Sequence, residues 1–169
     1  GDYQNITNNH IANIGLVPGH ASEGSLASGI MIEKNGSLIE FNTIENTGHC
    51  GIGLSSTVSV ITIKNNYINN VMLLLNDGGG IYIVGEGESR IIEGNIVLNV
   101  KGNTSGTPYP TRYIARGIYL DAHATNVLIK NNTVAHCTEG GFMIHRAHEN
   151  KLEYNTSFNN GSAMFLQNT

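Results

Sequence analysis

The amino-acid sequence predicts an all-β protein, a right-handed single-stranded parallel β-helix of about six to seven coils. The first observation is a phrase that recurs along the chain: glycine with an alternating apolar run, a polar turn, a second apolar run, and asparagine. The second is the spacing of the glycines that open this phrase, which is 22, 29, 37 and 24 residues for Gly29, Gly51, Gly80, Gly117 and Gly141. Such a period is typical of solenoids, in which each repeat forms one coil.

The apolar runs within each repeat predict short strands. They are rich in β-branched residues and alternate between apolar and other positions, as in residues 61–63 and 81–83, which suits a strand with one buried face. No window carries an apolar stripe of helical period. Because each strand recurs once per coil, it must pair with the same strand of the next coil, which builds parallel sheets with coils about 4.8 Å apart.

Asparagine holds one fixed place in the repeat, shortly after the second apolar run. We expect the side-chain amides at this place to stack along the axis as a hydrogen-bonded ladder. The residues concerned are Asn42, Asn66, Asn95, Asn132 and Asn155.

The composition predicts a single domain over residues 1–169, since 40% of the residues are hydrophobic and 13% are charged. The repeat is only partly present at residues 6–11 and 163–166, and neither end shows a polar capping coil. Solenoids need such caps. We therefore expect a β-helix truncated at both ends, with the remaining coils of a longer parent chain as its neighbours.

Charge and motif content exclude several classes of partner. The formal net charge is −4 without a run of like charge, so neither nucleic acid nor membrane is expected as a partner. The longest apolar run, residues 71–75, falls far short of the roughly 20 residues that span a bilayer. Histidines lack zinc-site spacing and carboxylates do not cluster, so no metal and no cofactor is expected.

The strand that follows each glycine should turn alternate residues outward. One outward column then contains Met31, Gly53, Tyr82, Tyr119, Met143 and Phe165, and the next contains Glu33, Ser55, Val84, Asp121, His145 and Gln167. Aromatic rings beside carboxylates suit sugar recognition, which makes Tyr82 and Tyr119 candidate substrate-binding residues. Alternatively, the two tyrosines only stack on each other across neighbouring coils.

Three insertions lengthen the repeat, at residues 15–27, 72–79 and 101–115. Insertions in a solenoid map to loops, often on the binding face, so we expect the last two to form walls beside Tyr82, Tyr119 and Asp121. Within the second insertion, the glycines that follow Asp77 are expected to bend the backbone tightly.

The phrases NDGGGIYIVG and RGIYLDAHATNVLIKNNTV resemble the catalytic portion of β-helix glycoside hydrolases, in particular family 141, which includes fucosidases and xylanases. Related phrasing occurs in family 120 xylosidases and in the wider, pectin lyase-like group of right-handed β-helix proteins. The resemblance covers residues 76–156. It implies a secreted or periplasmic carbohydrate-active enzyme in which Asp77 and Asp121 form the acid/base pair.

Two carboxyl groups are the usual requirement for glycosidic cleavage, one to protonate the leaving oxygen and one to activate water or attack carbon. Asp77 precedes its strand whereas Asp121 follows the next one, so their pairing requires the glycine bend to swing Asp77 over the sheet. Without that bend, Glu86, just past the strand that follows Asp77, is the better partner for Asp121. Both aspartates could instead be turn residues.

Further candidates surround this pair. Arg116 could bind an acidic sugar or tune a carboxylate. His145 could orient a hydroxyl group or shuttle a proton, and Arg146 follows it directly. Each could equally be a surface group, and His49 is expected in an exposed turn.

We therefore expect a glycoside hydrolase that acts on a plant or microbial polysaccharide or oligosaccharide through carboxylates on the outer face of one sheet. The alternatives are a polysaccharide lyase of the same fold and a non-catalytic carbohydrate-binding or structural segment of the tailspike or adhesin kind.

Overall fold

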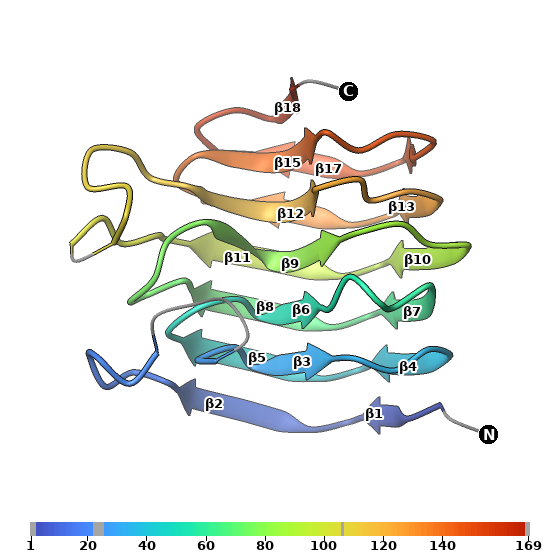
Figure 1. Cartoon of the computed structure of the whole chain (residues 1–169), viewed down its shortest axis with the longest axis horizontal. Helices are drawn as coiled ribbons and strands as arrows, with labels where there is room; N and C mark the ends of the chain where they lie inside the picture. The colour runs from blue at the N-terminus through green and yellow to red at the C-terminus, as the bar shows by residue number, and fades with distance from the viewer. Residues whose placement is uncertain (1–2, 22–25, 106, 168–169) are drawn as a thin grey trace.

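The computed structural model describes residues 3–21, 26–105 and 107–167, which form a parallel β-helix of stacked coils (Figure 1). The described residues build three parallel sheets of six strands each, which we call sheets A, B and C. Each coil passes through the sheets in that order, so the stack has six coils, as the repeat predicted.

Sheet A comprises β1 (Asn5–Thr7), β4 (Ser37–Glu40), β7 (Val60–Lys64), β10 (Ser89–Glu93), β13 (Val127–Lys130) and β16 (Lys151–Glu153). Sheet B comprises β2 (His10–Ile14), β5 (Thr43–Thr47), β8 (Tyr67–Val71), β11 (Ile96–Val100), β14 (Thr133–Ala135) and β17 (Thr156–Phe158). Sheet C comprises β3 (Ile30–Ile32), β6 (Ile52–Leu54), β9 (Gly78–Val84), β12 (Ala115–Asp121), β15 (Gly140–His145) and β18 (Met164–Gln167).

The asparagine ladder forms at the corner between sheets A and B. Asn66 donates from Nδ2 to Asn95 Oδ1 at 2.9 Å and to the Ile39 carbonyl at 3.0 Å. Its own Oδ1 accepts the backbone N–H and the Nδ2 of Asn42, both at 3.0 Å. Every polar atom of this buried amide thus has a partner, which is what burial of a polar group requires. The full file is Asn9, Asn42, Asn66, Asn95, Asn132 and Asn155.

The residue before each ladder asparagine turns the chain, with a φ between 54° and 65° in all six coils. Asparagine and glycine tolerate this left-handed conformation better than other residues. Two coils use an exposed aromatic residue there instead, Phe41 and Tyr154. The corner geometry is therefore imposed by the stacked coils even where the local residue disfavours it.

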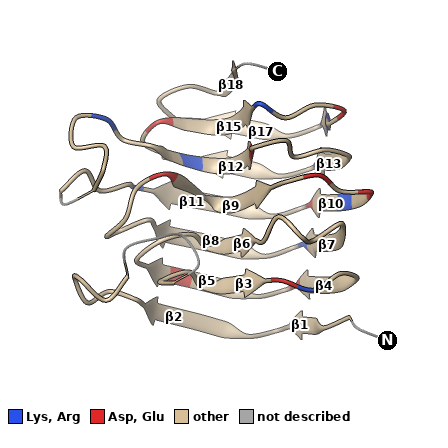
Figure 2. Ribbon diagram, viewed as in Figure 1, with Lys and Arg blue, Asp and Glu red and all other residues tan. Residues whose placement is uncertain are grey.

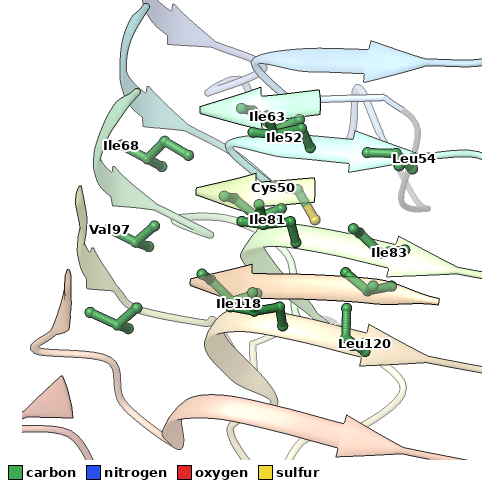
Figure 3. Close-up of a cluster of buried hydrophobic side chains, with 14 of the residues drawn as sticks. Cys50, Ile52, Leu54, Ile63, Ile68, Ile81, Ile83, Val97, Ile118 and Leu120 are labelled. Atoms are coloured by element: carbon green, nitrogen blue, oxygen red, sulfur yellow. The ribbon is translucent and has the colours of Figure 1, made fainter. Parts of the chain in front are cut away.

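The interior is a set of apolar files, one residue per coil, while the few charged residues lie mainly in the turns and on the outer faces (Figure 2). Ile52, Ile81 and Ile118 stack in register along sheet C and are fully buried (Figure 3). The predicted inward and outward alternation of this strand is confirmed, since Tyr82 and Tyr119 pair in the neighbouring outward column.

The expected glycine bend beside Asp77 is wrong. Residues 78–80 are the first three residues of β9 and are extended, whereas Asp77 itself has the left-handed φ of 61°. The absence of side chains serves close packing instead: a Cβ on Gly78 would lie 2.8 Å from both His49 Nε2 and Cys50 Sγ.

Candidate functional site

The candidate site lies on the outer face of sheet C, where the strands are longest and the loops project. The strands have 7 residues in β9, 7 in β12 and 6 in β15, against 3 in β3 and β6. The loops that precede these long strands and the loop after β2 project on the same side of the stack (Figure 1). Together they enclose a groove of about 1050 Å³, which is lined from residues 15–21, 74–77, 103–105 and 107–109, and by Ala27, His49 and Tyr82. All three insertions thus contribute to one groove. The predicted walls lie beside Tyr82, whereas Tyr119 and Asp121 are not among the residues that line the groove.

Asn76 ties two of these walls together. Its Oδ1 accepts the Ile114 N–H at 2.7 Å, and its Nδ2 donates to the Arg112 carbonyl at 2.8 Å. The backbone N–H of Asp77 also donates to the Ile114 carbonyl, at 2.9 Å. These bonds hold the end of the 101–115 loop against the turn that carries Asp77.

Asp77 stands at the floor of the groove with its side chain 40% exposed. Burial raises the pKa of its carboxyl above the ordinary value, and the Arg116 guanidinium, with Nη1 3.5 Å away, opposes this only in part. The carboxylates of Asp121 and Glu139 raise the pKa further, whereas His49 lowers it. Asp77 therefore keeps its proton more readily than an exposed aspartic acid. Asp77 directly precedes β9, whereas Asp121 is the last residue of β12, so the two aspartates lie at opposite ends of these paired strands.

Arg116 is enclosed by acidic and aromatic neighbours. Its side chain is only 4% exposed, its Nε lies 2.6 Å from Glu139 Oε2, and its guanidinium carbon lies 4.3 Å from the Tyr119 ring centre. Nε and Nη1 make no aligned hydrogen bond within the described part of the chain, so these contacts are electrostatic. Arg116 is thus better placed to tune Asp77 than to receive an acidic sugar.

Glu139 is a site residue that sequence reasoning missed. Its Oε1 also accepts from Arg112 at 2.9 Å, which links the 101–115 loop to the turn before β15. The signal was available, because the register pairs Arg116 with Gly140 on the next coil and so brings Glu139 beside it.

A second cluster centres on Asp121 at the far end of β12. Tyr82 donates its hydroxyl to Asp121 Oδ2 at 2.8 Å. Asp121 Oδ1 lies 2.7 Å from His145 Nδ1 and accepts the Ala122 N–H at 2.8 Å. The Tyr119 hydroxyl lies 3.4 Å from the same His145 nitrogen. Three polar groups thus hold the Asp121 carboxylate at the end of β12.

The two tyrosines lie side by side, with ring centres 4.9 Å apart and planes tilted by 42°. Burial raises the pKa of both phenols far above the ordinary value, and the Asp121 charge adds to this. Both therefore act as hydroxyl donors at neutral pH. They differ in access, since Tyr82 lines the groove whereas Tyr119 is only 2% exposed beneath Arg116.

Two further candidates, Glu86 and Arg146, do not line this groove, and His49 differs from its expected exposure. Glu86 is exposed in the turn after β9 and lines a separate hollow of about 430 Å³ with Glu88 and Glu149. Arg146 is exposed in the turn after β15. The expectation for His49 is wrong: it is 2% exposed because the glycine at position 78 lets it pack beneath β9.

No three His, Cys, Asp or Glu side chains within residues 3–21, 26–105 and 107–167 are arranged to hold a metal ion. The same described ranges contain no apolar helix long enough to cross a membrane.

The fold and the site define a parallel β-helix protein with a loop-walled groove on one outer sheet, an architecture that fits carbohydrate-active and pectin lyase-like proteins. The chain belongs to the family described as the right handed beta helix region, which matches residues 1–169. The fold is therefore a right-handed parallel β-helix, as the sequence predicted. Comparison with curated proteins and with solved structures found no match.

Proposed function

We propose that the protein is a glycoside hydrolase that acts on a plant or microbial polysaccharide or oligosaccharide. The observation that carries this proposal is the contrast between two aspartates on one outer sheet. Burial raises the pKa of Asp77, whereas Asp121 is held by the donors Tyr82, His145 and Ala122. A carboxyl group that burial keeps protonated suits the role of acid, and a carboxylate bonded to an imidazole suits the basic half.

Asp77 is the general acid in this proposal. It protonates the glycosidic oxygen as the bond to the anomeric carbon breaks, and Asp121 with its bonded groups forms the basic half that activates water. Arg116 neutralises the Asp77 carboxylate left after the proton has gone, since its Nη1 lies 3.5 Å away.

The groove supplies the binding surface. Val17, Leu74, Leu75 and Pro108 line it together with Tyr82, and such apolar and aromatic walls pack against the C–H faces of sugar rings. Polymers of this kind lie outside the cytoplasm, so the proposal includes a secreted or periplasmic location.

Substitution of the two aspartates tests the proposal. Asp77→Asn and Asp121→Asn should each lower kcat about 10²- to 10⁴-fold, measured as reducing ends released from a panel of plant and microbial polysaccharides. Glu88→Gln, which changes an exposed carboxylate just before β10, is the matched control and should leave kcat unchanged.

The leaving group sharpens this test. With 4-nitrophenyl glycosides the phenolate departs without a proton. Asp77→Asn should therefore lose much less activity on these substrates than on a polysaccharide, whereas the loss for Asp121→Asn should be the same on both. Equal losses of Asp77→Asn on both substrates would contradict the acid role. Unsaturated products would identify a lyase, and binding without turnover would identify a binding module.

A further inference from the structure

We propose that His145 is the catalytic base, acting through Nε2, and that Asp121 is a positioning residue that acts through it. This inference rests on the proposed glycoside hydrolase function and names the atom that receives the proton. In the reaction, Nε2 takes a proton from water while the water oxygen bonds to the anomeric carbon. The glycosidic bond breaks and its oxygen takes the proton of Asp77. Afterwards His145 releases its proton to solvent and Asp77 regains one.

The bonds of Asp121 argue against direct activation of water by this carboxylate. A carboxylate offers about four lone-pair sites, and Asp121 already engages Tyr82, His145 and Ala122 with them. Its side chain is 15% exposed, less than the 23% of His145. Water therefore has better access to the imidazole.

The same bonds fix the histidine tautomer. Asp121 Oδ1, at 2.7 Å, accepts a hydrogen bond, so His145 Nδ1 carries the proton. The Tyr119 hydroxyl approaches that same nitrogen, at 3.4 Å. Nε2, on the other side of the ring, is left with its lone pair and can accept a proton. The negative charge of Asp121 then stabilises the imidazolium that forms, the division of labour seen in Ser-His-Asp triads.

Neighbouring charge also permits this step. The guanidinium of Arg116, which lies over the Tyr119 ring, is 3.5 Å from Asp77 and 2.6 Å from Glu139. Two carboxylates thus compensate one guanidinium. Arg116 therefore adds no uncompensated positive charge that would oppose a proton on His145.

Ring-nitrogen NMR of the full chain tests the tautomer without reference to turnover. The ¹⁵N signals of His145 are assigned by their loss in His145→Gln. We expect the neutral ring to carry its proton on Nδ1 in the unsubstituted protein, and Asp121→Asn to shift this population towards Nε2. A proton on Nε2 in the unsubstituted protein would overturn the inference even if hydrolysis is observed.

Kinetics supply the second measurement, on the polysaccharide panel described above. His145→Gln should lower kcat about 10²- to 10⁴-fold, and Asp121→Asn should lower it by a comparable factor. The kcat of the double variant should be no lower than that of the less active single variant, because the two residues act as a unit. His148→Gln changes an exposed histidine three residues away and is the matched control for loss of an imidazole.

The outcomes separate the two proposals. If Asp77→Asn loses activity while His145→Gln keeps it, the hydrolase remains and Asp121 is itself the base. If the unsubstituted chain releases no reducing ends from the panel, the hydrolase proposal fails and the catalytic role of His145 fails with it.

Discussion

At the scale of single residues, the site uses one residue type in two environments. Asp77 sits in a left-handed turn, where burial opposes ionisation. Asp121 sits at a strand end, where a hydroxyl, an amide and an imidazole bond its oxygens. The surroundings, and not the side chain, therefore set the chemical role of each carboxyl group.

The raised pKa of Asp77 has a consequence for stability. A carboxyl whose pKa is higher in the folded than in the unfolded state contributes stability at low pH, which is lost as pH rises through the folded pKa. Asp77→Asn removes this loss, and asparagine tolerates the φ of 61°. The free energy of unfolding of this variant, relative to the unsubstituted protein, should therefore rise between pH 3 and pH 7.

Urea unfolding at both pH values measures this difference, with Glu86→Gln as the control for removal of one negative charge. A difference that stays constant or falls as pH rises would show that Asp77 is not held against ionisation.

At the scale of elements, register is fixed by side-chain columns on two sides of the coils. The asparagine ladder occupies the corner between sheets A and B, and a column of alternating charge runs along the outer face of sheet A, through Glu40, Lys64, Glu93, Lys130 and Glu153. Lys64 pairs with Glu40 at 3.1 Å, and Lys130 with Glu93 at 3.1 Å. A slip by one residue would turn every ladder amide away from its partners.

The ladder makes the middle of the stack the most sensitive place for substitution. Asn66→Ala removes the acceptor of two Asn42 donors and the donor to Asn95 and Ile39. Because each buried polar group left without a partner costs about 1–3 kcal/mol, we expect a loss on the order of 3 kcal/mol in the free energy of unfolding. Urea denaturation measures it, with the exposed Asn5→Ala as control. A loss below about 1 kcal/mol would mean that water replaces the ladder bonds.

At the scale of the whole molecule, the stack turns distant segments into neighbours. The groove joins residues 15–21, 74–77 and 107–109 because the three loops leave the coils on one side. Arg116 and Glu139 meet for the same reason, since successive coils place their strands side by side.

The sequence was informative wherever a feature repeats. The glycines, the asparagine file and the outward column of Tyr82 and Tyr119 recur once per coil, so their stacking could be predicted. The groove walls could be predicted because insertions interrupt the period. Features that depend on a single contact could not be predicted in this way. Glu139 has the sequence context of a turn residue, and the burial of His49 depends on how β9 packs over it.

The pH dependence of kcat/KM tests the acid role of Asp77 most directly. Asp77 must be protonated to act, so activity should fall as pH rises through its raised pKa. Burial raises this pKa most, and the charges of Arg116, Asp121, His49 and Glu139 modify it. We predict that Asp77→Asn removes this alkaline limb together with most of the rate on polysaccharide. An alkaline limb that persists unchanged in Asp77→Asn would contradict the account.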